Sequence, residues 1–167
     1  MLSDLRRGPV DYPRVKALKR ALLETAFQTF LRCHFNRETE RALAFRAFLM
    51  ENADWLSDYA LFRVLMEENG NFPTWDRWAP EHRSPATARA WLGSLPGKRN
   101  EDLARKQVFF TYVQWLAFNQ WQDLKAYGTT KRVAPSVVKT LQSIPTNRLQ
   151  AFREYLVAES AVERWEE

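Results

Sequence analysis

The chain has 167 residues, close to the length of a single domain; 46% of them are hydrophobic and 14% aromatic. This composition is globular and excludes a disordered tail or linker. The 25 lysines and arginines are interleaved with 20 aspartates and glutamates, which leaves a formal net charge of +5. We therefore expect a mixed-charge surface, with no nucleic acid among the partners of the protein.

Cysteine and histidine are too scarce for a disulfide framework or a zinc site. Cys33 is the only cysteine, and His34 and His82 are the only histidines. No apolar run approaches the roughly 20 residues that span a bilayer, and no signal-peptide core is visible near the start. We expect a cytoplasmic protein with no metal, no cofactor and no membrane partner.

The first predicted helix begins after Asp11, which can cap it, with Pro13 in its first turn. Apolar residues at spacings of three and four predict its buried face. This face comprises Val15, Leu18, Leu22, Ala26, Phe27, Phe30 and Leu31. A second helix is expected over residues 37–50, with Asn36 as its cap.

A third helix is predicted to open at Asp54 and to end near Asn69 and Gly70. Apolar residues cover most of its circumference, so we expect burial on several sides. These residues are Trp55, Leu56, Tyr59, Ala60, Leu61, Phe62, Val64, Leu65 and Met66. Glu67 and Glu68, near its end, are expected to be solvated.

Residues 71–97 differ in composition from the helical stretches, because they are rich in proline and contain Trp75, Trp78 and Trp91. The pattern predicts an ordered excursion with one short helix, started by Ser84 and Pro85. The flat rings of the tryptophans could stack on sugars. Anchoring to the core is the favoured interpretation, because aromatic side chains dominate core burial.

The longest predicted helix covers residues 101–127 and stops at Gly128. Its apolar stripe comprises Val108, Tyr112, Trp115, Leu116, Phe118 and Trp121, which are expected in the core. Further helices are predicted over residues 136–143 and from residue 146 or 147 to residue 165. The fold class is therefore all-α, with a helical segment over residues 1–128 and a helical tail, residues 129–167, packing on it.

Four spaced stretches resemble a known family. The string Trp-Leu-x-Asp-Tyr-Ala-Leu-Phe, which runs from Trp55 to Phe62, resembles a signature of glycoside hydrolase family 77, the 4-α-glucanotransferases. Three other stretches resemble the same family in order and spacing. They are Val10-Asp11-Tyr12 with Val15, Lys19, Ala26, Phe27 and Phe30; Trp75 with Trp78, Pro80 and Arg83; and Phe109 with Gln114, Trp115, Gln120, Trp121, Lys125 and Tyr127. The resemblance extends from about residue 9 to residue 127.

The resemblance implies an irregular multi-helix assembly that corresponds to the helical part of a larger (β/α)8-barrel enzyme, without the barrel. Family members transfer α-1,4-glucan segments between maltooligosaccharides through a covalent glucosyl-enzyme intermediate, so a maltooligosaccharide or α-glucan is the implied partner. The nucleophile Asp, acid/base Glu and third Asp lie in family motifs that this chain lacks, and no Gly-Asp-x-Pro string follows Tyr127. We therefore assign no catalytic, substrate-binding or metal-binding residue and expect the chain as given not to catalyse.

Two acidic residues in the signature could still act as a pair. Retaining glycoside chemistry needs two carboxyl groups about 5 Å apart. Asp54 and Asp58 lie four residues apart, but a helix cap and a buried hydrogen bond are the favoured roles. The alternative function is a stand-alone helical module that binds glucan or protein without catalysis. Without a barrel, an apolar helix face left exposed predicts self-association.

Overall fold

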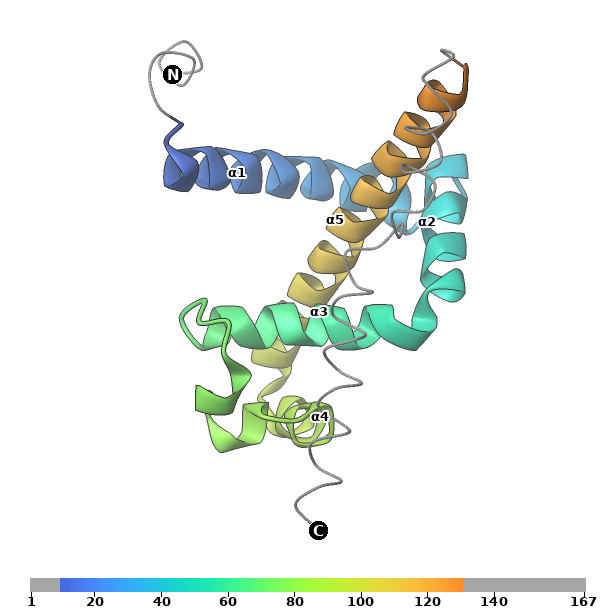
Figure 1. Cartoon of the computed structure of the whole chain (residues 1–167). Coiled ribbons are helices and arrows are strands. Elements are labelled where there is room, and N and C mark those ends of the chain that lie inside the picture. Colours follow the sequence, from blue (N-terminus) through green and yellow to red (C-terminus); the bar gives the residue numbers. More distant parts are fainter. Residues whose placement is uncertain (1–9, 131–167) are drawn as a thin grey trace. The chain divides into compact units, whose positions relative to one another are not determined.

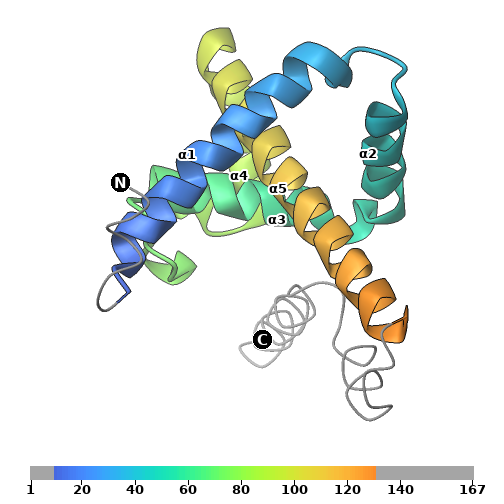
Figure 2. The same ribbon diagram turned by 90° about the horizontal axis from the view of Figure 1, so that it is seen from above.

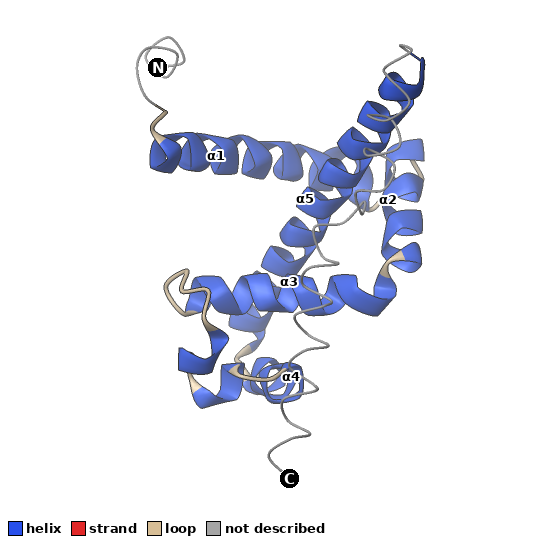
Figure 3. Cartoon of the chain, viewed as in Figure 1, coloured by secondary structure: helices blue, strands red, loops and turns tan. Residues whose placement is uncertain are grey.

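The structure is a computed structural model, and it describes residues 10–130. Every regular element in this range is a helix, and the described part contains no strand (Figure 3). The predicted all-α class is confirmed. The described residues fall into two units that divide between Val113 and Gln114, inside the last helix, and each unit is considered by itself. No helix within residues 10–130 is long and apolar enough to cross a membrane.

The first helix, α1, covers Tyr12–Phe30 and continues as a π-helical turn, Leu31–Phe35. Asp11 caps it as predicted, because its Oδ1 accepts a hydrogen bond from the Arg14 backbone N–H at 3.1 Å. Phe27 and Phe30 are buried, but the prediction for Leu22 is wrong, since this side chain is 61% exposed. At 3.6 residues per turn, Leu22 lies about 140° around the helix from Phe27.

The second helix, α2, covers Glu40–Glu51 and begins later than predicted. Thr39 caps it, with extended backbone and an Oγ1 that accepts from the Ala42 N–H at 3.2 Å. The prediction of Asn36 as the cap is therefore wrong. Asn36 ends the preceding π-helical turn instead, because residues 31–35 prolong α1. Figure 1 shows α2 linking one end of α1 to one end of α3.

The third helix, α3, covers Ala53–Glu68, and six of its apolar residues are buried, which agrees with the prediction. Asp54 lies in the first turn, and Asn52 takes the cap position, so Asp54 is not the cap. The Asn52 side chain instead links the end of α2 to the start of α3: it donates to the Phe48 carbonyl at 2.9 Å and accepts from Trp55 Nε1 at 3.2 Å. The helix ends at Asn69, followed by Gly70 at φ 70°, as predicted.

Beyond α3, two 3₁₀ turns, Trp75–Arg77 and Pro80–His82, lead to α4, Pro85–Ser94. Ser84 caps α4 through its hydroxyl, as predicted. Trp78 is buried against Leu61, Leu65 and Ala88, with Trp75 and Trp91 packed around them. This packing supports the interpretation of the three tryptophans as anchors of the excursion on α3.

The last described helix, α5, covers Gly97–Thr130, so it starts earlier than predicted and continues through Gly128. Within the first unit, Phe109 packs edge-on against Phe27 with centroids 5.4 Å apart. Tyr112 packs against Phe30 and Phe45, with ring centroids 4.9 and 6.4 Å away. Figure 2 shows the start of α5 passing close to α1 and α3. An aromatic core therefore joins α1, α2 and the start of α5.

In the second unit, the predicted core residue Trp115 is buried and Trp121 is half-buried. The helices predicted over residues 136–143 and from residue 146 or 147 to residue 165 lie outside the described residues. The same holds for nearly all of the tail, residues 129–167, so its packing stays a prediction.

Candidate functional site

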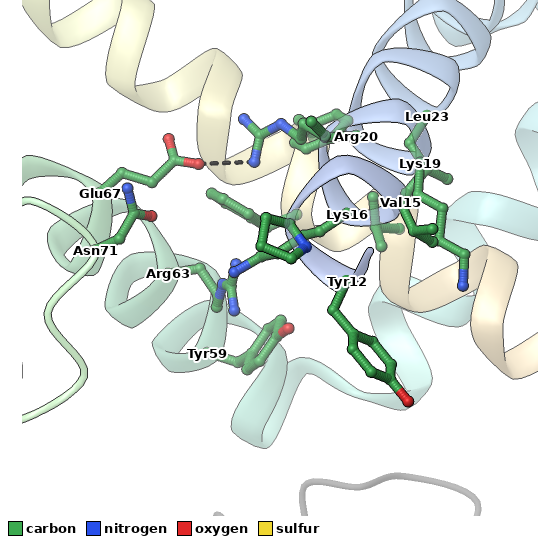
Figure 4. A pocket seen from close by; sticks show the side chains of 15 residues that line it. Tyr12, Val15, Lys16, Lys19, Arg20, Leu23, Tyr59, Arg63, Glu67 and Asn71 are labelled. Carbon is green, nitrogen blue, oxygen red and sulfur yellow. Dashed lines mark hydrogen bonds and ion pairs between the residues drawn. The ribbon is translucent and has the colours of Figure 1, made fainter. Parts of the chain in front are cut away.

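An open cavity of about 840 Å³ lies between α1, α3 and the start of α5 (Figure 4). Its apolar lining comes from two of these helices: Val15, Ala17 and Leu23 from α1, and Phe109, Phe110 and Val113 from α5. Phe109 and Phe110 contact each other edge-on with centroids 5.4 Å apart. Because the core holds Phe109 against Phe27, this wall of the cavity is rigidly placed.

Arg20 is the best-connected charged residue of the cavity. Its Nη1 donates to Glu67 Oε1 at 2.7 Å, and its Nε donates to Glu24 Oε1 at 2.5 Å. The guanidinium also lies over the Phe109 ring, 4.5 Å from its centroid. Burial lowers the pKa of Arg20, but the hydrogen bond to Glu24 and the charge and hydrogen bond of Glu67 outweigh it, so the pKa lies above its ordinary value.

The acidic end of α3 is held by cations from two helices. Glu67 pairs with Arg20 of α1 and, at 3.5 Å, with Lys106 of α5. Glu68 pairs with Lys106 at 3.2 Å and with Arg99. The expectation that Glu67 and Glu68 are solvated is therefore wrong. Glu67 lines the cavity and pairs with both α1 and α5, whereas Glu68 pairs with α5 alone, so the ion pairs of the two carboxylates together link the three helices.

Three further cations line the cavity: Lys16 and Lys19 from α1 and Arg63 from α3. Among the described residues, no acidic side chain pairs with any of them. The Arg63 guanidinium lies 4.9 Å from the centroid of the Phe110 ring, and its Nε is buried without a hydrogen-bond partner. With Arg20, the lining holds four cations against the single carboxylate of Glu67, a net charge of +3.

The cavity brings together residues from stretches that resemble the family. Tyr12, Val15 and Lys19 come from the first of these stretches and Tyr59 from the octapeptide, yet all four line the same cavity. Figure 4 shows Tyr59 beside Arg63. The resemblance to the family rests in part on these residues, and no site was predicted at any of them. The cations of α1, which recur at helical spacing beside Tyr12 and Val15, were the one available signal.

The remaining acidic residue of interest, Asp58, pairs with Arg89 of α4. Its side chain is 34% exposed, so the predicted buried hydrogen bond is in fact a half-exposed ion pair that attaches α4 to α3. Within residues 10–130, no group of three or more His, Cys, Asp or Glu side chains could hold a metal ion. The assignment of no catalytic and no substrate-binding residue stays a prediction.

Fold and cavity together define an α-helical segment that has its own aromatic core and presents a cationic cavity built from family-like stretches. The family model described as 4-alpha-glucanotransferase matches residues 2–136. The chain belongs to this family.

Three relatives carry the same name, 4-alpha-glucanotransferase. The protein from Thermus thermophilus is 37% identical over 120 residues, which are 72% of this chain and 22% of the relative. The proteins from Synechocystis sp. and Aquifex aeolicus are 31% and 30% identical over 75% and 86% of this chain, and over 23% and 26% of their own lengths. The chain thus spans about a quarter of the length of the relatives it matches.

Proposed function

We propose that the chain is the helical segment of a 4-α-glucanotransferase, a protein that transfers α-1,4-glucan segments between maltooligosaccharides in the cytoplasm. The match of residues 2–136 to the family model carries this proposal. Three relatives from different bacteria support it, and this chain matches about a quarter of the length of each relative. The reacting groups then lie in the part of the polypeptide outside the match.

The role of the segment in that protein is to support the barrel and to shape the side of the barrel where the acceptor maltooligosaccharide binds. Its own described carboxylates hold helices together: Glu67 and Glu68 pair with cations of α1 and α5, and Asp58 pairs with Arg89. The aromatic core lets the segment keep its shape while the cavity faces outward. These features support a positioning role for the segment, with no bond broken or formed by its residues.

Two assays test the proposal. The purified chain, incubated with maltotriose, should release neither glucose nor longer maltodextrins. A chimera should retain disproportionation when the 120 matched residues of the Thermus thermophilus relative are replaced by their counterparts from this chain. The relative with a flexible linker in place of the matched residues serves as the inactive control.

Each assay has an outcome that contradicts the proposal. Glucose and longer maltodextrins made by the chain alone would show that it carries its own catalytic groups. A chimera that is folded, as judged by circular dichroism, but inactive on maltotriose would refute the assignment of the segment to this enzyme.

A further inference from the structure

Three cations of the cavity, Lys16, Lys19 and Arg63, have no acidic partner among the described residues, and the Nε of Arg63 is buried without a hydrogen bond. Arg63 is held in place by stacking over Phe110, so its guanidinium is already oriented. A guanidinium fork matches a carboxylate in two parallel hydrogen bonds. Lys16 and Lys19 lie on adjacent turns of α1 at the rim of the same cavity. Glu67 does not compete for them, because Arg20 and Lys106 already pair with it.

The surroundings of these cations are apolar. Val15, Phe109 and Phe110 form part of the lining. At the start of α1, Tyr12 is 75% exposed and Val10 is 56% exposed. Phe109 and Phe110 are buried, so the apolar surface that reaches solvent is that of Val10 and Tyr12, with the half-buried Val15 beside them. Exposed apolar side chains rimmed by charge are typical of a contact with another stretch of polypeptide.

We propose that this cavity is the docking site for an acidic polypeptide segment that carries an apolar side chain. That segment corresponds to a part of the full-length relatives that this chain does not match. This step rests on the proposed function, because relatives of the chain are about four times longer than the stretch they share with it. One carboxylate of the segment binds Arg63, a second lies near Lys16 and Lys19, and the apolar side chain enters the cavity against Val15 and Leu23, which are half-buried.

The test uses overlapping 15-residue peptides that cover the Thermus thermophilus relative outside the matched stretch, with fluorescence anisotropy against the full chain. Peptides that bind should be net negative and contain a large apolar residue, and their affinity should fall as salt rises. The variant Lys16→Gln/Arg63→Gln should lower the affinity for these peptides at least about tenfold, the loss expected for one charge-assisted hydrogen bond. The control variant Arg32→Gln/Lys98→Gln likewise removes two positive charges, but both are exposed and lie outside the cavity, and it should bind the peptides within about twofold of the parent.

Circular dichroism establishes that each variant is folded. If Arg63→Gln prevents folding, Lys16→Gln/Lys19→Gln replaces it, because both lysines are exposed on α1. The proposal is overturned if no peptide binds, if binding ignores peptide charge, or if the control variant weakens binding as much as the cavity variant. It is also overturned if maltoheptaose or inorganic phosphate binds with the same sensitivity to the cavity variant while the peptides do not. If the chimera is active but no peptide binds, the docking proposal is refuted and the proposed function is still supported.

Discussion

Replacing Trp78 by alanine should remove the centre of the packing between α3 and the excursion that follows it. The indole is 3% exposed and contacts Leu61, Leu65 and Ala88. Its ring lies 5.2 Å from that of Phe62, and its Nε1 donates to the Phe72 carbonyl at 2.8 Å.

The expected loss in the free energy of unfolding is about 3–4 kcal/mol. Truncating a buried tryptophan to alanine costs about 3–5 kcal/mol. The lower half of this range applies, because Phe72 is exposed and water can hydrate its carbonyl once the indole is gone. For a unit of this size, the loss lowers the melting temperature by roughly 10–20 °C. The variant Trp78→Phe keeps a ring and loses the N–H donor, so it should cost about 1–2 kcal/mol.

Urea and thermal unfolding, followed by circular dichroism, measure these losses. Tyr12→Ala is the matched control, because this aromatic side chain is largely exposed and its removal should change stability by less than about 0.5 kcal/mol. An unfolding midpoint of Trp78→Ala equal to that of the parent would refute the argument. If the affinity for maltoheptaose fell while stability stayed the same, Trp78 would be a sugar platform and not an anchor.

The other predictions concern an ion pair, a helix cap and the tail. In a double-mutant cycle, Arg20→Met and Glu67→Gln should couple by about 1–2 kcal/mol, a value reduced because the Arg20 side chain is 34% exposed; additive losses would contradict the pairing. Since the pKa of folded Arg20 is raised, this stabilisation is complete below the ordinary arginine pKa and is lost only as the pH rises through the raised value, so stability measured at neutral and mildly alkaline pH should show the same coupling. Thr39→Ala should cost about 1 kcal/mol by urea unfolding, whereas Asn36→Ala should be close to neutral; the reverse order would restore Asn36 as the cap. Truncation after residue 130 should expose the apolar face that residues 129–167 are predicted to cover, and light scattering should show association that rises with concentration; a monodisperse truncated chain would count against that packing.

Helix boundaries could be predicted where a single local signal was present. Asp11 before Pro13, and Ser84 before Pro85, each combine a capping side chain with a proline in the first turn, and both caps are confirmed. The predicted start of α2 was wrong because Asn36 and Thr39 are both good capping residues. The choice between them depended on the π-helical extension of α1, which the spacing of apolar residues does not reveal.

The sequence by itself determined the helical class, the family and the buried character of α3, because all three depend on residue types and spacings along the chain. Only the tertiary structure decided which residues meet. The cavity exists because the aromatic core holds α1 against the start of α5 and the ion pairs of Glu67 hold both against α3, which brings Lys19 and Tyr59 to one opening together with Arg63. Such a meeting depends on helix packing angles and on the direction of each side chain, which periodicity within one helix does not specify.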